Sequence, residues 1–419
     1  MTTALAPPTA PDRWEQRLQT AAHPVAYRLL RAVAARGPVV RVPRVGVVVS
    51  DAALAREVLG DTVHFTKTGP GSPADLWTPV LGPSVLLNME GSDHTALRRR
   101  LSGLFTPGYV AALCARVLAQ PLADLTRRLR AGEEVDLVRV AQICAGAAIC
   151  EIVGMPVEPG RFATAHAEAS EVTRMVRLWR PSMTGRQVSR AREVLGKLTA
   201  SAVTAYREGS EETLPGRLHG LGLSEVEARG AVGAFLLTGT ETLVSFIPRL
   251  VALCHDTGRL AGPGMLSCSG SRGGADGGGG AGGYDGADGS AVAGLDAVVE
   301  EALRVTVPSP VMLRSVAVAT TVGGVPVAPG DRVVIATLLC AQAYGPFAPE
   351  RPHPPELRRL WFGAGPHFCL GMPLAMAQIH AVLDAVLAAG PTAVTGRRAA
   401  RRVLIPGYAR LDLKLRSTT

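Results

Sequence analysis

The sequence predicts a mainly α (α+β) fold, with a large helical part and a small β-rich part. Helical hydrophobic periodicity dominates residues 94–202 and 224–255, whereas strand patterns are confined to short runs such as residues 39–51 and 324–339. With 419 residues, of which 47% are hydrophobic, the chain is long enough to enclose an extensive core.

The first elements of the chain are short. The pattern predicts an amphipathic helix over residues 24–36, two strands around a turn over residues 39–51, and a helix from Ala52. Residues 61–93 are rich in Gly, Pro and Ser and predict a long functional loop. The helical stretch that follows is expected to break at Pro107, Pro121, Pro156 and Pro181.

A long apolar helix is predicted at the centre of the fold. Ser224 and Glu227 form a capping box at its start. The helix then runs towards His255 with apolar residues nearly all round, as in a buried helix. Pro248 is expected to kink or break its last turns.

The C-terminal part contains a Gly-rich segment of low complexity, residues 270–289, which cannot bury a core and predicts a flexible insertion. A helical pattern resumes at Leu295, a long helix follows Cys369, and short β-like runs end the chain. We therefore expect an N-terminal tail over residues 1–24 and a single domain over residues 25–419.

Composition excludes several classes of protein. No uninterrupted apolar run reaches the roughly 18 residues of a membrane-spanning helix and the N-terminus has no hydrophobic signal core, so no membrane and a cytoplasmic location are expected. The net charge of +9 favours an acidic partner, but scattered arginines without interleaved aromatics argue against nucleic acid. Seven cysteines without metal-type spacing are predicted to be free thiols: Cys114, Cys144, Cys150, Cys254, Cys268, Cys340 and Cys369.

Cys369 stands in an unusual frame, FGAGPHFCLG. Gly363 and Gly365 permit backbone angles that other residues resist, so the chain can turn sharply before a helix. Cys369 is then expected at the helix N-terminus, where free N–H groups and the helix dipole would lower the pKa of its thiol. A thiolate can be a nucleophile or a metal ligand, although His367 is awkwardly placed to act as the base for a nucleophile.

The pattern F-G-x-G-x-H-x-C-x-G resembles the haem-binding signature of cytochrome P450 monooxygenases. It is filled by Phe362, Gly363, Gly365, His367, Cys369 and Gly371. The resemblance implies the cytochrome P450 fold, a haem b cofactor (iron protoporphyrin IX), and Cys369 as the thiolate ligand of the iron.

Glu301 and Arg304 resemble the family's E-x-x-R pair, which lies on one helix face and locks the cysteine loop. The segment that usually supplies a third partner departs from the family pattern here. Arg351, Arg358 and Arg359 are all candidates.

His94 and Arg98 resemble the family's H-T-x-x-R, and the resemblance implies that their side chains meet the haem propionates. In a helix the two lie on one face, and arginine suits carboxylates. Arg314 and His367 occupy the two other propionate positions of the family.

Thr238-Gly239-Thr240-Glu241-Thr242 resembles the family's Ala-Gly-x-Glu/Asp-Thr in the central helix. The resemblance implies that Thr242 stabilises activated dioxygen and that Glu241 relays protons to it. The alternative for Thr242 is a hydrogen bond to its own helix carbonyl. Thr238 replaces the usual small apolar residue, so the details of oxygen handling are expected to differ.

Substrate selection is predicted to lie in residues 61–93, residues 174–183 and the central helix, where several of the few aromatic and methionine side chains gather. Phe65, Trp77 and Met89 look exposed in this pattern. The side chains expected to line the pocket are Leu237, Thr238, Trp77, Met175 and Trp179.

The implied reaction is insertion of one oxygen atom from dioxygen into a small organic substrate by hydroxylation or epoxidation, as in the tailoring of secondary metabolites. Oxidative coupling or cyclisation in the same fold, and a haem-binding sensor without turnover, stay open as alternatives. Electrons are expected from NAD(P)H through a ferredoxin and its reductase, which would dock near basic residues such as Arg99, Arg100 and Arg359. We expect a monomer.

Overall fold

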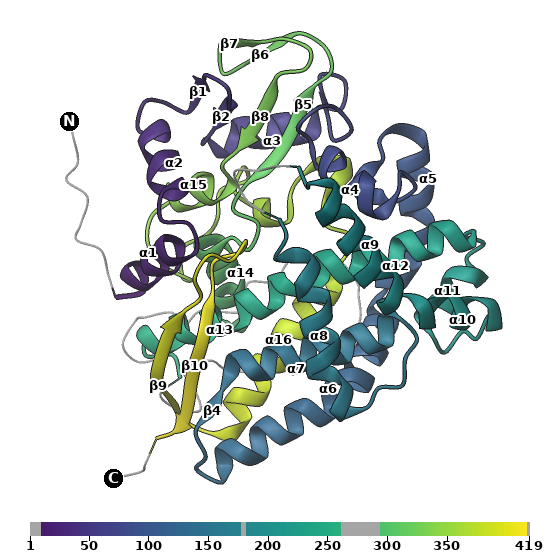
Figure 1. The fold of residues 1–419 in the computed structure, drawn as a ribbon. Helices are drawn as coiled ribbons and strands as arrows, with labels where there is room; N and C mark the ends of the chain where they lie inside the picture. The colour runs from purple at the N-terminus through teal and green to yellow at the C-terminus, as the bar shows by residue number, and fades with distance from the viewer. Residues whose placement is uncertain (1–9, 177–181, 261–293, 417–419) are drawn as a thin grey trace, which may run out of the picture.

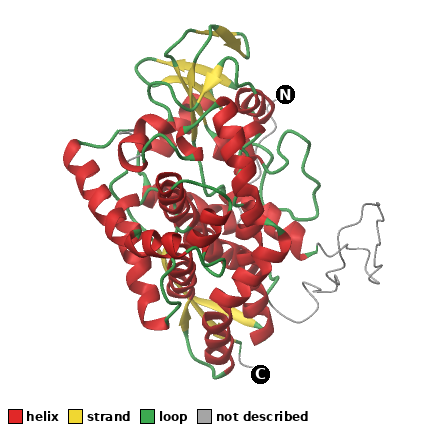
Figure 2. Ribbon diagram, turned by 90° about the vertical axis from the view of Figure 1, so that its right-hand side faces the viewer, coloured by secondary structure: helices red, strands yellow, loops and turns green. Residues whose placement is uncertain are grey.

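The computed structural model describes residues 10–176, 182–260 and 294–416. Helices fill most of the molecule, and the strands gather near two opposite ends of it (Figures 1 and 2). The predicted mainly α fold with a small β-rich part is therefore confirmed. The predicted insertion over residues 270–289 lies outside the described residues.

The helices are numbered in chain order. Those of the first half are α1 (Ala10–Ala22), α2 (Ala26–Ala34), α3 (Ala52–Gly60), α4 (Pro73–Leu81), η1 (Leu86–Asn88), α5 (Gly91–Ser102), η2 (Gly103–Phe105), α6 (Pro107–Arg130), α7 (Leu137–Ile152), α8 (Pro159–Thr173), α9 (Gly185–Leu198) and α10 (Ala200–Glu208). Those of the second half are α11 (Leu214–Gly220), α12 (Glu225–Gly239), α13 (Glu241–Asp256), α14 (Leu295–Thr306), α15 (Thr337–Gln342), η3 (Leu360–Phe362), η4 (Gly365–His367) and α16 (Met372–Ala389).

Three sheets are present in the described residues. The largest has the strand order β1-β2-β8-β5-β3, with β2 and β8 parallel and the other neighbours antiparallel. The others have the orders β4-β10-β9 and β6-β7. The strands are β1 (Val39–Val42), β2 (Gly46–Val49), β3 (Phe65–Thr66), β4 (Val135–Asp136), β5 (Met312–Val316), β6 (Thr320–Val322), β7 (Val325–Val327), β8 (Arg332–Ile335), β9 (Thr392–Ala399) and β10 (Tyr408–Leu415).

The helix pair α12 and α13 crosses the middle of the molecule (Figure 1). The predicted capping box is confirmed, because the Ser224 hydroxyl accepts from the Glu227 N–H while the Glu227 carboxylate accepts from the Ser224 N–H. The helix breaks at Thr240, at φ −94° and ψ −55°, and not at Pro248, which lies inside α13. Burial of α13 against α7, α14 and α16 outweighs the hydrogen bond that Pro248 cannot make.

Four other predictions need correction. Helix α1 occupies residues 10–22 and Glu15 forms a buried ion pair with Arg249 of α13 (Oε1–Nε 3.0 Å), so this part of the chain is no tail. Pro121 lies within α6, whose packing against α16 holds the helix together. Phe65 is buried because β3 pairs with β5, and residues 61–93 include helix α4 rather than one long loop.

Two helical stretches in the described part of the chain, Glu225–Asp256 and Met372–Ala389, are long and apolar enough to cross a membrane, and a bent pair over residues 91–130 would make a third. The expectation based on uninterrupted apolar runs missed them, because isolated polar residues interrupt both stretches. In the fold, α13 and α16 pack against each other and against further helices, which accounts for their apolar composition.

Candidate functional site

The loop that carries Cys369 is shaped by its glycines. Gly363 and Gly365 have φ angles of +84° and +65°, in the left-handed region, as predicted. A Cβ atom on Gly365 would lie 2.7 Å from the Leu59 carbonyl oxygen, so only glycine fits there. The Cys369 N–H donates to the Phe362 carbonyl at 2.9 Å and closes the loop ahead of α16.

The Cys369 side chain is the only exposed one among the described cysteines. Its sulfur accepts from the N–H groups of Gly371 and Met372 at the start of α16, and Arg98 adds positive charge. Although the sulfur is accessible, the surrounding protein desolvates the thiol and raises its pKa above the ordinary value, an effect that outweighs the helix terminus and Arg98. The predicted lowering of the pKa is therefore wrong.

Five basic side chains gather beside this loop: Lys67, His94, Arg98, Arg314 and His367. We call them, with Glu90, the cationic edge. The rings of His94 and His367 stack with centroids 4.2 Å apart, and His367 Nε2 lies 2.6 Å from Glu90 Oε2. Glu90 also accepts from the Lys67 N–H at 2.5 Å. The structure thus brings together all four residues predicted for the propionates, and adds Lys67 and Glu90.

The cationic edge carries more positive than negative charge. Burial and the nearby charge of Arg314 together lower the pKa of Lys67 to about 7. Burial, His367 and Lys67 together lower the pKa of His94 to about 4. Burial also lowers the pKa of Arg314 to about 10. Arg98 and Arg314 stay charged near neutral pH and Lys67 is close to half-charged, with Glu90 as the one carboxylate among them. A ligand with more than one negative charge would balance the remaining positive charge.

Glu301 and Arg304 form a second charged cluster, which we call the buried lock. Arg304 Nε and Nη2 donate to the two oxygens of Glu301, each at 2.7 Å, and both side chains are fully buried. Arg304 also donates to three main-chain carbonyls, those of Ala341, Gly345 and Pro346, at 2.6 to 3.0 Å. Burial alone would raise the pKa of Glu301, but the hydrogen bonds from Arg304 and His353 lower it.

The third partner of the lock is His353, which was not among the arginine candidates. Its Nε2 lies 2.7 Å from Glu301 Oε2. Arg351 reaches only to 3.8 Å from Glu301, and Arg359 pairs with Glu300 instead. Arg358 contributes its main-chain carbonyl as an acceptor for Arg56.

The break between α12 and α13 leaves Thr238 and Gly239 exposed between buried residues of the central helix. A Cβ atom on Gly239 would meet no atom within 4 Å, so this point of the helix borders open space. The Thr242 hydroxyl donates to the Thr238 carbonyl at 3.3 Å, which is the helix-bonded alternative. Glu241 instead reaches α8, where it accepts a hydrogen bond from Ser170.

The predicted substrate residues differ in their surroundings. Leu237 is buried, whereas Trp77 and Met175 are half-buried against the core. The Thr238 hydroxyl donates to the Ala234 carbonyl at 2.7 Å. Trp179 lies outside the described residues.

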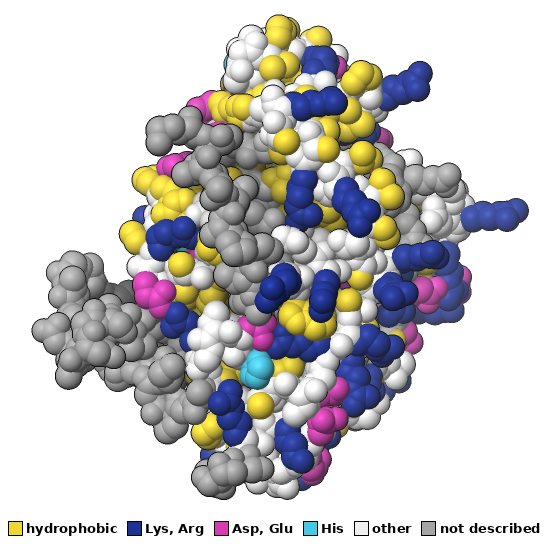
Figure 3. Space-filling model, turned by 90° about the vertical axis from the view of Figure 1, so that its left-hand side faces the viewer, with side chains coloured by type: hydrophobic (Ala, Val, Ile, Leu, Met, Phe, Trp, Pro, Cys, Tyr) yellow, Lys and Arg dark blue, Asp and Glu magenta, His cyan; other side chains and the backbone are white. Residues whose placement is uncertain are grey.

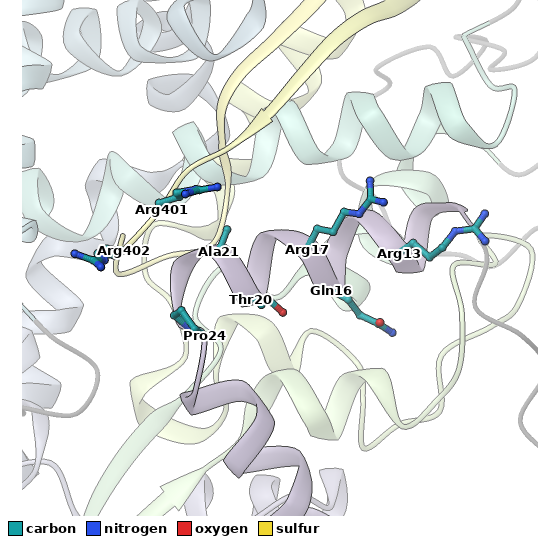
Figure 4. A pocket seen from close by; sticks show the side chains of 8 residues that line it. All are labelled: Arg13, Gln16, Arg17, Thr20, Ala21, Pro24, Arg401 and Arg402. Carbon is teal, nitrogen blue, oxygen red and sulfur yellow. The ribbon is translucent and has the colours of Figure 1, made fainter.

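A cavity of about 660 Å³ lies elsewhere, between α1 and the turn that precedes β10 (Figure 4). Its walls include four arginines, Arg13, Arg17, Arg401 and Arg402. None of the residues predicted for the cofactor or the substrate lines it, so we do not assign it to the reaction.

The residues around Cys369 fit a haem. Its sulfur is accessible although it lies deep in the fold, Gly239 borders open space, and the cationic edge lacks anions that two propionates would supply. Among the described residues, no group of three or more His, Cys, Asp or Glu side chains forms a metal site. His367 Nδ1 is buried and has no hydrogen-bond partner among the described residues, so a bound ligand can supply one.

Comparisons with known proteins agree with this fold. The mutant of P450 EryK in complex with erythromycin B superimposes with a TM-score of 0.72 at 23% identity, covering 94% of this chain and 97% of that one. The fold is thus that of the cytochrome P450 enzymes. A family model described as Cytochrome P450 matches residues 288–389.

Two curated relatives cover most of the chain. Cytochrome P-450 monooxygenase DoxA of Streptomyces sp. (strain C5) is 31% identical over 394 residues, 85% of either chain. Erythromycin C-12 hydroxylase of Saccharopolyspora erythraea is 28% identical over 349 residues, 79% of this chain and 78% of the relative. The chain therefore belongs to the cytochrome P450 family, and it is a monooxygenase, an oxidoreductase whose family cofactor is haem.

Proposed function

We propose that this monooxygenase hydroxylates or epoxidises a small organic molecule of secondary metabolism. The observation that carries the proposal is the accessible Cys369 thiol beside a cationic edge in which five basic side chains share one carboxylate. Two relatives are named as a hydroxylase of erythromycin and as the monooxygenase DoxA, which supports a tailoring role. When bound, haem supplies the activation of dioxygen.

We assign the cofactor contacts to the residues of two regions. Cys369 is the iron ligand, while Phe362, Gly363 and Gly371 shape the loop around it. The proposed propionate partners are His94, Arg98, Arg314 and His367. The guanidinium groups of arginine and the imidazole N–H groups of histidine are good hydrogen-bond donors to carboxylates. Burial of these donors also keeps water from competing for the carboxylates.

We assign proton handling to Thr242 and Glu241. The Thr242 hydroxyl donates across a long 3.3 Å contact to its own helix, a weak bond that it can exchange for another acceptor. The Glu241 carboxylate, 28% exposed, is held by Ser170 and can take up and release a proton. Thr238, Leu237, Trp77 and Met175 are proposed to shape the substrate pocket.

We propose that electrons reach the enzyme from NAD(P)H through a ferredoxin and its reductase, in the cytoplasm, and that the enzyme is a monomer. The net charge of +9 supports an acidic carrier. Lys and Arg side chains are spread widely over the face that Figure 3 shows, on the side of α1 and α2, whereas α5 with Arg99 lies on the opposite side in Figure 1. Arg99 is exposed, whereas Arg100 pairs with Glu227 and Arg359 with Glu300, so Arg99 has the freest charge of the three.

The absorption spectrum of the reduced protein under carbon monoxide tests the haem assignment. Thiolate-ligated haem gives a strongly red-shifted Soret band, and we expect this band in the unmutated protein. Cys369→His should abolish the shift, whereas Cys114→Ser, at a half-buried cysteine elsewhere, should keep it. A histidine-like carbonyl spectrum in the unmutated protein would refute the proposal. Substrate-dependent oxygen consumption with a surrogate ferredoxin system then separates a monooxygenase from a haem sensor.

A further inference from the structure

Glu241 belongs to a chain of three polar side chains that joins α13 to α8. The Ser170 hydroxyl donates to Glu241 Oε1. His166 Nε2 lies 3.3 Å from Ser170 Oγ and 3.5 Å from Glu241 Oε1. His166 and Ser170 are 5% and 2% exposed, so Glu241 has a buried polar pair on one side and accessible space on the other.

The hydrogen bonds of this chain have one direction. Ser170 has a single hydroxyl proton, which it donates to the carboxylate, so its oxygen can only accept from His166. His166 therefore carries a proton on Nε2. The neutral ring already meets this requirement, and whenever His166 takes up a second proton, a continuous path runs from the imidazolium through Ser170 to the ionised Glu241 carboxylate.

We propose that Ser170 and His166 are positioning residues for the reaction: Ser170 fixes the Glu241 carboxylate, and His166 returns a proton to it through the Ser170 hydroxyl. The inference rests on the role proposed for Glu241 above. In this step the Nε2–H bond of the imidazolium breaks as an O–H bond forms on Ser170, and the original Ser170 proton moves to Oε1 of Glu241. Imidazole and carboxyl end neutral, no electrons move, and a proton taken up from solvent restores the imidazolium.

The surroundings of His166 suit such a step. Burial lowers the pKa of His166, the Glu241 carboxylate raises it, and Arg174 and Arg139 lower it, with a net lowering. These are the charged groups that face the ring from α13, from the end of α8 and from α7. When Glu241 gives up its proton, its new negative charge favours uptake of a proton by His166. Because the pKa of His166 lies below its ordinary value, proton return is expected to slow as pH rises through the acidic range towards neutrality.

The first test compares variants of the haem-loaded enzyme in NADPH oxidation with a surrogate ferredoxin and reductase, between about pH 5 and 8. Ser170→Ala and His166→Gln should each lower the rate about fivefold, the effect of one lost hydrogen bond, and should flatten its decline with pH. Ser170→Thr restores the hydroxyl and should recover the rate. Thr173→Ala is the control, because the Thr173 hydroxyl donates to the Ser170 carbonyl and not to Glu241.

Glu241→Gln distinguishes failure of this inference from failure of the role proposed for Glu241. If Glu241→Gln slows the enzyme while Ser170→Ala and His166→Gln keep the rate and pH profile of the unmutated protein, the inference is wrong and the role of Glu241 stands. If Glu241→Gln also leaves the rate unchanged, the proposed role of Glu241 fails and the inference with it. The carbonyl spectrum checks that each variant is folded and loaded.

A second measurement does not depend on turnover. NMR of ¹³C-labelled histidines in the reduced carbon monoxide complex, which is diamagnetic, can measure the pKa of His166. The His166 signal is assigned as the one that disappears in His166→Gln. The pKa of His166 should lie below the ordinary value and should fall further in Glu241→Gln, because the carboxylate that raises it is gone. An unchanged His166 pKa in Glu241→Gln would show that the two groups are not coupled and would overturn the inference.

Discussion

The buried lock and the cationic edge are both clusters of buried charged groups, but they differ in how well the positive groups are matched by carboxylates and other acceptors. In the lock, the Glu301 carboxylate is bonded to Arg304 and His353, and the remaining Arg304 donors reach main-chain carbonyls. In the cationic edge, five basic side chains share one carboxylate, Glu90. The pKa of Glu301 is accordingly lowered by its partners, whereas those of Lys67 and His94 are lowered by burial and repulsion.

This difference separates a scaffold from a binding site. A buried charge costs free energy unless partners offset the loss of water, and the lock has these partners within the chain. The cationic edge has too few such partners within the chain, so its positive groups carry an unfavourable electrostatic free energy that an anionic ligand would reduce. Removing a charge should therefore destabilise the lock, but should relieve the edge as long as no cofactor is bound.

The largest expected effect comes from Arg304→Met. It leaves the Glu301 carboxylate buried with His353 and the more distant Arg351, 3.8 Å away, as its remaining side-chain partners, and loss of one member of a buried pair costs about 3–5 kcal/mol. Urea unfolding measures the change. Arg359→Met is the control, because Arg359 forms a more exposed pair with Glu300 and its loss should cost less than about 1 kcal/mol. Equal effects of the two variants would contradict the lock.

The pH dependence of the haem-free protein comes next. The folded protein holds the pKa of His94 at about 4, against 6.5 in an unfolded chain, so the unfolded state binds more protons between these values. Stability should therefore rise with pH through this window. His94→Gln should reduce the slope of the unfolding free energy against pH. An unchanged slope would show that folding does not lower the pKa of His94.

Arg314→Met should move two quantities in opposite directions. Without haem, the variant should be at least as stable as the unmutated protein, because a buried cation with little compensation is gone. With haem, dissociation should be about ten- to a hundredfold faster, since a charged hydrogen bond is worth roughly 1.5–3 kcal/mol. Haem transfer to apomyoglobin measures the rate. A loss of stability in the haem-free protein would count against the proposed imbalance.

The smallest effect is expected at His353. His353→Gln keeps a donor near Glu301 Oε2 while Arg304 and the Ala348 N–H still hold the carboxylate, so the cost should be about 1 kcal/mol. Urea unfolding again measures it. A loss as large as that of Arg304→Met would mean that His353, and not Arg304, is the principal partner of Glu301.

Much of the site could be predicted from local sequence. The glycines of the cysteine loop and the spacing of His94 with Arg98 depend on neighbouring residues only, and the structure has the predicted glycine angles and places both side chains on α5. Lys67, Glu90 and His353 carry no such signal. Lys67 and Glu90 lie 23 residues apart, and His353 lies 52 residues from Glu301, so only folding reveals these contacts.

The sequence by itself determined the family, the position of the cysteine loop and the central helix, because short-range periodicity, capping and backbone freedom fix these features. Tertiary structure decided the rest. Packing carried α6 and α13 through Pro121 and Pro248, and strand pairing buried Phe65. It also set the charge of the Cys369 thiol, since desolvation, a property of the whole surrounding fold, outweighs the nearby helix terminus.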